Sequence, residues 1–305
     1  MKILHGIDDV ELSKKGLNFI NLEMTKLCNL QCMYCFEDSG EADLDELSLE
    51  EKQSVLIQAK ELGAKSLIIS GAGEPLLDPD FKTTIKYAYA LGMTSVIYTN
   101  GTLIDSDMVN LFYTHDCTPI LKLDSLKSKI HDTLTGVSGT HAKAMNAIKL
   151  LLAKGFGSSG LGDECMTKIA TATLYLKQNL QEISSIIEWA EDKGIKPTVD
   201  FLGVHGRAKR NESILKPTLD EIFSVQQLGR GESVCQFQEP CKLWKYGILI
   251  SNKGYAKYCS EIATEKIGNI REYSLSELLE RKIRLFPAKA GSYTCPLKEK
   301  AYLLK

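Results

Sequence analysis

Three cysteines lie within one eight-residue stretch, CNLQCMYC, at positions Cys28, Cys32 and Cys35. Thiolates are the ligands that iron–sulfur clusters require. A [4Fe–4S] cluster takes four ligands, so three cysteines leave one iron open for chemistry, much as a catalytic zinc site keeps one position free. Chance occurrence, a zinc site and a disulfide are the alternatives. Zinc sites usually come as CxxC pairs, and a disulfide would leave one thiol over. The loop therefore favours an iron–sulfur cluster.

The CxxxCxxC spacing, with the aromatic Tyr34 before the last cysteine, resembles the cluster motif of the radical S-adenosylmethionine (SAM) enzymes. That resemblance implies that the three cysteines bind a [4Fe–4S] cluster and that the amino and carboxylate groups of SAM chelate its open iron. It also implies an enzyme that cleaves SAM reductively. The resulting 5'-deoxyadenosyl radical then takes a hydrogen atom from the substrate.

The composition is that of an ordinary soluble globular protein, with 44% hydrophobic and 25% charged residues. The net charge of −2 lacks the excess of basic residues that is typical of nucleic-acid-binding proteins. We find neither an apolar run long enough to span a membrane nor a signal peptide. Nine cysteines without an export signal indicate metal binding or catalysis rather than disulfides. A reducing cytoplasm is the expected location.

Apolar runs alternate with helical patterns along the first two thirds of the chain. Alternation of this kind predicts parallel β/α units, and therefore an α/β fold. Six units favour a partial (β/α)6 TIM-like barrel, which the radical SAM resemblance also implies. We expect the barrel over residues 1–215, a linker over 216–234 and a small C-terminal α+β domain over 235–305. The expected strands are 17–24, 66–70, 94–99, 119–124, 168–174 and 197–204, and the expected helices are 48–62, 80–91, 105–113, 140–154 and 180–193.

Catalytic groups of a β/α barrel lie at the C-terminal ends of its strands. The stretch GAGEP after the second expected strand resembles the family's GGEP motif, with Ala72 in place of a glycine. Glycine lets the main chain approach a ligand closely. The resemblance implies that Gly71, Gly73 and Glu74 hold the amino group of SAM. A plain turn before a helix is the alternative.

The fourth expected strand ends in LKLDS, which resembles the family's V-S-L-D-G stretch. Lys122 stands where the serine faces the SAM carboxylate, and Thr135 stands where a basic residue often precedes a glycine. We hypothesise that the cation pairing with the SAM carboxylate has moved to Lys122; the alternative is a lysine that extends to solvent. Asp124 is assigned to the same cofactor site.

Three further residues after strand ends are candidates for the cofactor site. Asn100 and Asn179 could contact the ribose or the substrate, or could simply cap a loop. The GRA stretch at Arg207 resembles one found in molybdopterin-synthesis and SPASM-type members. The guanidinium of Arg207 could hold the SAM carboxylate, the adenine or an anionic substrate group. A surface arginine is the alternative.

Four later cysteines follow the barrel region: Cys235, Cys241, Cys259 and Cys295. The spacing from Cys241 through Gly254 to Cys259 resembles the opening of SPASM or shortened "twitch" domains. That resemblance implies a hairpin, with strands at 246–251 and 255–259, that holds an auxiliary [4Fe–4S] cluster. Too few cysteines are present for two auxiliary clusters, so we expect one. Cys235 is either its fourth ligand or a free thiol that donates hydrogen to the substrate. Structural zinc is the alternative for this set.

The resemblance implies a radical SAM oxidoreductase or epimerase, similar to twitch enzymes that act on aminocyclitols and aminoglycoside sugars. We expect a small hydroxyl-rich substrate, because only 27 residues precede Cys28 and peptide-modifying relatives usually carry an N-terminal docking domain. A flavodoxin- or ferredoxin-type protein would supply the electron. Dehydrogenation is expected over epimerisation if Cys235 is a ligand. The alternatives are a radical SAM peptide maturase and an iron–sulfur or zinc protein without catalysis.

Overall fold

The computed structural model describes residues 2–3, 16–158, 166–226, 247–258 and 266–285. The chain divides into two units, and each is described by itself. Unit 1 comprises Met1–Asp8, Cys28–Gly40 and Ile97–Gln236. Unit 2 comprises Asp9–Leu27, Glu41–Val96 and Phe237–Lys305. The boundary falls within strand β4 (Thr94–Thr99).

Unit 2 is built on a mixed sheet in the order β11-β10-β9-β2-β3. Strand β2 pairs in parallel with β3 on one side and with β9 on the other, while β9, β10 and β11 run antiparallel. All four residues of β2 and of β9 are buried, as in strands covered on both faces. The bounds are β2 (Phe19–Leu22), β3 (Ser66–Ile69), β9 (Gly247–Ile250), β10 (Tyr255–Lys257) and β11 (Lys266–Asn269).

The helices of unit 2 are α1 (Leu49–Glu61), α2 (Phe81–Ala90) and α11 (Leu275–Leu285), with a 3-10 turn η2 (Pro75–Leu77). Helix α1 begins with a capping box, because the Ser48 hydroxyl accepts from the amide of Glu51 and the Glu51 carboxylate accepts from the amide of Ser48. The helix expected over 48–62 is thus confirmed as α1. Helix α1 packs on α2 and on α11 within this unit.

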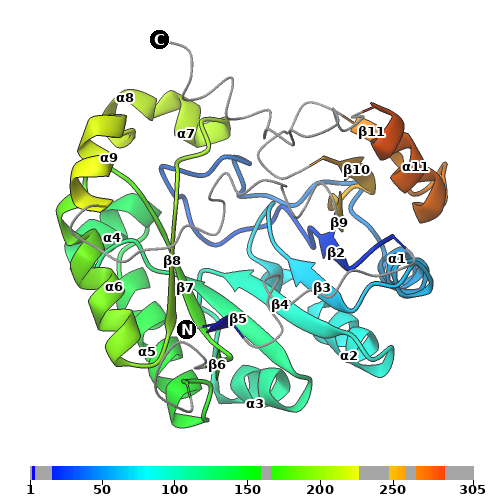
Figure 1. Cartoon of the computed structure of the whole chain (residues 1–305), viewed down its shortest axis with the longest axis horizontal. Helices are drawn as coiled ribbons and strands as arrows, with labels where there is room; N and C mark the ends of the chain where they lie inside the picture. The colour runs from blue at the N-terminus through cyan, green and yellow to red at the C-terminus, as the bar shows by residue number, and fades with distance from the viewer. Residues whose placement is uncertain (1, 4–15, 159–165, 227–246, 259–265, 286–305) are drawn as a thin grey trace. The chain divides into compact units, whose positions relative to one another are not determined.

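Unit 1 holds the parallel strands β5 (Cys117–Lys122), β7 (Ala170–Leu174) and β8 (Lys196–Asp200), with β7 between the other two. A separate parallel pair joins β1 (Lys2–Ile3) to β6 (Met166–Thr167). Helices α3 and α5 pack on β5, and α6 packs on β8 (Figure 1). The helices are α3 (Ser106–Thr114), α4 (Ser128–Thr135), α5 (Thr140–Ala153), α6 (Ile183–Asp192), α7 (Gly206–Arg210), α8 (Glu212–Leu215) and α9 (Leu219–Gln226), with η3 at Leu180–Glu182.

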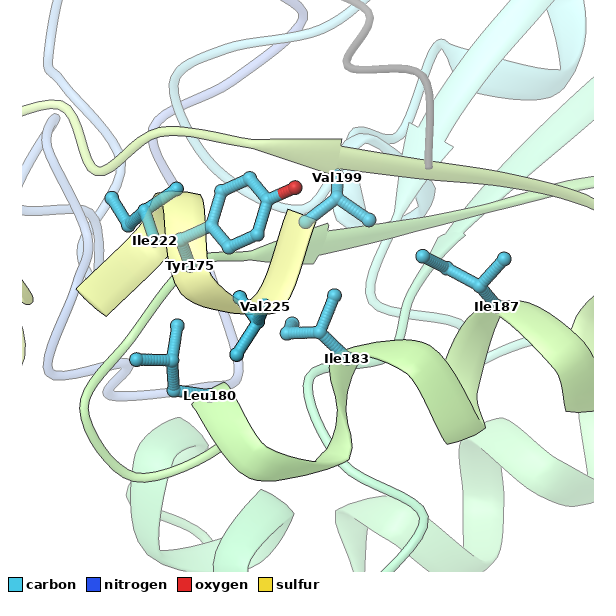
Figure 2. Packing of buried hydrophobic residues seen from close by; sticks show 7 residues of the cluster. All are labelled: Tyr175, Leu180, Ile183, Ile187, Val199, Ile222 and Val225. Carbon is cyan, nitrogen blue, oxygen red and sulfur yellow. The ribbon is translucent and has the colours of Figure 1, made fainter. Parts of the chain in front are cut away.

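A buried apolar cluster fixes α6 and α9 against the end of the unit 1 sheet. Figure 2 shows Ile222 and Val225 of α9 beside Tyr175, with Leu180, Ile183, Ile187 and Val199 completing the group. Burying one such aliphatic side chain contributes roughly 1.5–3 kcal/mol. Helix α9, which falls in the segment expected as a linker, is thus anchored by packing.

The α/β fold class is confirmed, with each expected strand up to 204 present, although β2, β3, β7 and β8 are shorter than predicted. Helix α4 is an addition, because no helix was expected between 124 and 140. The division into 1–215, 216–234 and 235–305 stays a prediction. Among the residues that the structure describes, no helix is long and apolar enough to cross a membrane.

Candidate active site

The cysteine loop is held in unit 1 by main-chain hydrogen bonds. The amide of Cys28 donates to Gly40 O at 2.9 Å, which closes the loop across its ends. The amides of Gln31 and Met33 donate to the last residues of α4, Thr135 at 3.0 Å and Leu134 at 2.9 Å. Helix α4 therefore supports the residues on either side of the second cysteine, Cys32.

The three thiols of the loop act on one another electrostatically. Burial, together with the smaller effect of the neighbouring thiols of Cys28 and Cys35, raises the pKa of Cys32 to about 12. The amide of Ser39 lies 3.4 Å from Cys35 Sγ, as a donor to that sulfur. Thiolates crowded in this way require a compensating cation, and iron provides one.

No three His, Cys, Asp or Glu side chains converge on one metal-ion position within the described ranges. A [4Fe–4S] cluster places its irons on separate corners, so its ligands need not converge on one point. Three thiols in a closed loop, with an N–H group directed at one sulfur, fit a cluster of this kind.

Tyr34 is buried beneath this loop, among Leu134, Leu176 and Leu202. Burial and then the charge of Asp124 raise the pKa of its phenol. In the described part of the chain, Tyr34 Oη and Asp124 Oδ2 are buried polar atoms without a hydrogen bond of good geometry. Such orphaned atoms are uncommon in native structures and need an explanation. Here the explanation lies within the chain, because Asp124 and Cys32 both interact with the Tyr34 phenol.

Lys122, at the end of β5, lies on Tyr34 and Asp124. Its ammonium is 2.5 Å from Asp124 Oδ1 and 4.9 Å from the centre of the Tyr34 ring. The side chain is 22% exposed, so it neither extends freely into solvent nor is sealed off. The predicted contact with the SAM carboxylate stays a prediction. The structure adds that Asp124 is the partner of Lys122 within the chain.

Asn179 is fully buried, and its amide bonds to the main chain. Its Nδ2 donates to Asp124 O at 2.7 Å and to Leu174 O at 2.9 Å, and its Oδ1 accepts from the amide of Leu176. This arrangement corresponds to the loop-capping alternative, and it fixes the turn after β7 next to Asp124. The ribose contact expected for Asn179 has no support in this geometry.

Asn100 links the turn after β4 to the cysteine loop. Its Nδ2 donates to Asn29 Oδ1 at 2.9 Å, and Asn29 Nδ2 donates to Thr102 Oγ1 at 2.8 Å. Its Oδ1 accepts from the amide of Thr102. The sequence did not single out Asn29, although it lies between two of the cysteines. A ribose contact for Asn100 stays a prediction.

Arg207 lies on the cysteine loop and not on an open surface. Its Nε donates to Cys32 O at 3.0 Å, and its Nη2 donates to Ser39 O at 2.7 Å. Its Nη1 pairs with Asp38 at 3.0 Å. These contacts join residues that are up to 175 positions apart in the sequence. The predicted contact of Arg207 with SAM or substrate stays a prediction.

The glycine motif of unit 2 lies against the strand end that leads to the cysteines. The amide of Gly73 donates to Thr25 O at 2.7 Å, and the amide of Glu74 donates to Leu27 O at 2.8 Å. A Cβ on Gly73 would collide with the Leu27 carbonyl, so only glycine fits. Gly71 has a φ of 89°, which also favours glycine. The Glu74 carboxylate is buried and caps η2.

Glu23 is a buried carboxylate that lies next to the glycine motif and that the sequence pattern did not single out. Its buried carboxylate pairs with Lys257 of β10 at 3.0 Å, and a Cβ on Gly71 would lie 2.5 Å from Glu23 Oε1. The available signal was an ionisable residue within the apolar run LEM. Buried carboxylates usually need a partner, and here β10 supplies it within unit 2.

The four later cysteines lie outside the described residues, so the predicted auxiliary ligands Cys235, Cys241, Cys259 and Cys295 have no geometry here. The hairpin expected between two of them is present as β9 and β10, joined by a turn in which the amide of Gly254 donates to Ser251 O. The ligand set and the catalytic role of Cys235 stay predictions.

Curated relatives are similar over much of the chain. Mycofactocin maturase MftC of Mycobacterium ulcerans is 31% identical over 215 residues, which is 70% of this chain and 55% of that protein. The chain thus spans about half the length of that relative. The AdoMet-dependent heme synthase of Methanosarcina barkeri is 26% identical, over 86% of this chain and 83% of that protein.

Solved structures support the same fold. Streptococcus suis SuiB bound to precursor peptide SuiA matches with a TM-score of 0.66 and 18% identity, over 87% of this chain and 65% of that one. Native anSMEcpe with bound AdoMet matches with a TM-score of 0.62 and 16% identity, over 88% of this chain and 82% of that one. At such identities the likeness concerns the fold alone.

The model of the radical SAM superfamily matches residues 22–190, more than half of the chain. The match includes the cysteine loop, the glycine motif and the strand that carries Lys122. SAM and a [4Fe–4S] cluster are the cofactors of that superfamily, and SPASM-like relatives also use an auxiliary cluster, so the predicted cofactors are confirmed at the level of the family. The chain belongs to the radical SAM superfamily.

Proposed function

We propose that this protein is a radical SAM peptide maturase, which abstracts a hydrogen atom from a carbon of a peptide substrate. The observation that supports the proposal is the 31% identity over 215 residues with a protein named mycofactocin maturase. Peptide maturation was the alternative to a small hydroxyl-rich substrate. The relatives favour it over the sugar or aminocyclitol substrate, which becomes the weaker candidate.

The proposed roles of the residues are given for each unit by itself. Cys28, Cys32 and Cys35 hold the cluster, which when bound supplies the electron for cleavage of SAM and so the radical that abstracts hydrogen. Gly73 and Glu74 keep the main chain close to the strand end, where the superfamily binds the amino group of SAM. Helix α4 and the buried leucines around Tyr34 exclude water from one side of the thiols.

Lys122 and Asp124 place one positive and one negative charge beside the Tyr34 ring. A carboxylate group of SAM would be attracted by the ammonium, and Asp124 holds that ammonium in place. We assign Lys122 the role of carboxylate partner on this ground. Arg207 is assigned to the cysteine loop instead.

Tetrapyrrole chemistry is the second candidate. The heme synthase of M. barkeri matches over 83% of its own length, a larger share than for the maturase. Its lower identity of 26% makes it the runner-up. In both cases the chemistry begins with hydrogen abstraction from carbon, and the two substrates differ in size and charge.

We also propose a reducing cytoplasm as the location and a flavodoxin- or ferredoxin-type protein as the electron donor, because an exposed cluster is sensitive to oxygen. Dehydrogenation rather than epimerisation remains our preferred outcome if Cys235 ligates the auxiliary cluster. A free Cys235 thiol would instead be placed to return hydrogen to the substrate radical.

The test is substrate-stimulated SAM cleavage by the anaerobically reconstituted full chain. With dithionite as reductant, formation of 5'-deoxyadenosine is measured alone and with short peptides encoded beside the gene. Parallel assays contain Fe-coproporphyrin III or aminocyclitols. We expect stimulation by a peptide, together with a mass change in that peptide.

Stimulation by the tetrapyrrole alone would favour the second candidate, and stimulation by an aminocyclitol alone would restore the small-substrate prediction. A variant with Cys28, Cys32 and Cys35 all changed to Ala is the blank, since it should produce no 5'-deoxyadenosine in any assay. Activity in this blank would contradict the cluster assignment itself.

A further inference from the structure

The segment 206–211 donates hydrogen bonds to the main chain of the cysteine loop within unit 1. The amides of Arg207 and Ala208 both donate to Cys35 O, at 2.9 and 3.2 Å. Asn211 Nδ2 donates to Met33 O at 3.0 Å. Gly206, with a φ of 50°, packs so closely that a Cβ there would collide with the Phe36 carbonyl. The main chain of the loop therefore rests on this segment between Met33 and Phe36.

The Arg207 side chain adds further contacts with the cysteine loop. Its guanidinium reaches Cys32 O on one side and Ser39 O on the other, with Asp38 between them. The side chain is 16% exposed, so water competes little for these contacts. A planar guanidinium can serve three acceptors at once because its donors have fixed directions.

The turn that Arg207 contacts contains a residue in the left-handed region. Asp38 adopts a φ of 55°, a conformation that Asp tolerates better than most residues other than glycine. Its carboxylate also pairs with Arg210 at 2.8 Å, but Arg210 is 61% exposed and, in the contacts described, reaches only that carboxylate. Arg207 and Arg210 are thus neighbours on one helix with different contacts.

We propose that Arg207 is a positioning residue for the [4Fe–4S] cluster, which fixes the carbonyl groups of Cys32 and Ser39 and thereby sets the thiols of Cys32 and Cys35 for iron. The proposal rests on the cysteine assignment in the proposed function, but it assigns Arg207 to the loop and not to SAM or substrate. The amide of Ser39 also donates to Cys35 Sγ. Ser39 therefore connects the two groups, because its carbonyl accepts from Arg207 and its amide donates to the sulfur.

The first test uses the full-length apoprotein and does not depend on a cluster. Iodoacetamide labelling of each cysteine is followed by peptide mass in the wild type, Arg207→Ala and Arg210→Ala. We expect Arg207→Ala to speed labelling of Cys32 and Cys35 by about threefold or more, because the loop opens more often. Arg210→Ala should label like the wild type, since exposed ion pairs contribute little. Buried Cys117, outside the loop, is the internal control for global unfolding.

The second test uses the anaerobically reconstituted full chain. The reduced cluster signal that shifts on addition of SAM is followed by electron paramagnetic resonance during exposure to an iron chelator. Arg207→Ala should lose this signal about tenfold faster than the wild type or Arg210→Ala, in line with loss of charge-assisted hydrogen bonds. Arg207→Lys should not restore the wild-type rate, because an ammonium cannot span the three acceptors.

Three results would overturn the proposal. One is wild-type labelling and chelator resistance in Arg207→Ala, whether or not SAM affinity falls. Another is an equal loss in Arg210→Ala, which would assign the effect to charge at Asp38. The third is full rescue by Arg207→Lys. If Arg207→Ala does not fold, as judged by circular dichroism and Cys117 labelling, Arg207→Lys takes its place and must differ from the wild type. A wild type without a SAM-responsive cluster would refute the proposed function. The labelling test would still show whether Arg207 holds the cysteine loop.

Discussion

The ammonium of Lys122 lies 2.5 Å from the carboxylate of Asp124, a side chain that is completely buried. Asp124 Oδ1 also accepts from the amide of Leu174 at 3.0 Å. The ion pair therefore joins the end of β5 to β7 directly below the Tyr34 ring. It gives Lys122 a structural role in addition to the proposed contact with SAM.

Changing Lys122 to Ala should affect stability and SAM binding separately. Leaving the buried Asp124 charge without its partner should lower the free energy of unfolding of the apoprotein by about 2–3 kcal/mol. Loss of the SAM contact should weaken SAM binding about tenfold or more. Urea unfolding and equilibrium binding of SAM to the reconstituted protein measure the two effects.

The double variant Lys122→Ala/Asp124→Asn is the control for this pair. Removing both charges should recover part of the stability but none of the SAM affinity. Recovery of both would mean that Lys122 acts on SAM only through the fold.

Replacing Cys28, Cys32 and Cys35 together by Ala should abolish SAM cleavage in a protein that remains folded. These thiols lie in a loop held mainly by main-chain bonds, so their loss removes ligands rather than core packing. Cys117→Ala is the matched control, because this buried thiol at the start of β5 is not in the loop. Formation of 5'-deoxyadenosine and the circular dichroism spectrum are the measurements.

The reconstituted protein should hold about eight irons per chain, from two [4Fe–4S] clusters. The triple alanine variant of the first loop should keep about half of them. Iron and zinc are measured together by elemental analysis. Zinc in place of the residual iron would support the structural-zinc alternative for the later cysteines.

Cys235→Ala decides between the two roles proposed for that residue. If Cys235 is an auxiliary ligand, the variant should lose iron and all turnover. If it is the hydrogen donor, the iron content should stay intact and the substrate radical should be left unquenched. Turnover in deuterated water, followed by product mass, completes the test, because epimerisation by the wild type would add one solvent deuterium without a change in oxidation level.

Asp132 should give the connection from α4 to α5 a pH-dependent stability. Burial acts to raise its pKa, but the amides of His141 and Gly139 and the hydroxyl of Thr140 outweigh it and lower the pKa below the ordinary 3.8. A carboxylate with a lowered folded pKa stabilises the protein above its unfolded pKa, and this contribution is lost as the pH falls through the folded value. Asp132→Ala should therefore cost about 1 kcal/mol at pH 7 and much less near pH 2.

Urea unfolding at several pH values measures this difference. Asp107→Ala, which removes an exposed carboxylate from the first turn of α3, is the matched control and should cost less at pH 7. Equal costs at pH 7 and pH 2 would contradict an electrostatic role for Asp132.

Local patterns predicted most of the fold because the strands are apolar runs ended by glycine or polar turns. Helix α4 was missed because its sequence, SKIHDTLT, is polar and only eight residues long, and its support comes from contact with the cysteine loop. The pairing of β9 with β2 joins residues more than 200 positions apart, and no local pattern carries that information.

The candidate site was predictable in its parts and less so in its connections. The cysteines and the glycine motif have fixed spacings, so the sequence identifies them. Arg207 and Asn179 are candidates for ligand contacts because each follows a strand end, and those contacts stay predictions. In the structure both side chains also bond to main chain, and such contacts depend on how the loops fold. Glu23 was hidden because a charged residue in a strand is recognisable as functional only when its partner, Lys257, is known.

The contact between Gly73 and Leu27 changes how a familiar experiment should be interpreted. Leu27 is followed in the chain by Cys28, so any side chain placed at position 73 would press on the residue that precedes the first thiol. The result for an inactive Gly73→Ala variant would be ambiguous. Displacement of the Cys28 thiol and weaker binding of SAM would both abolish SAM cleavage. Cluster content must be measured in that variant before its loss of activity is assigned to SAM.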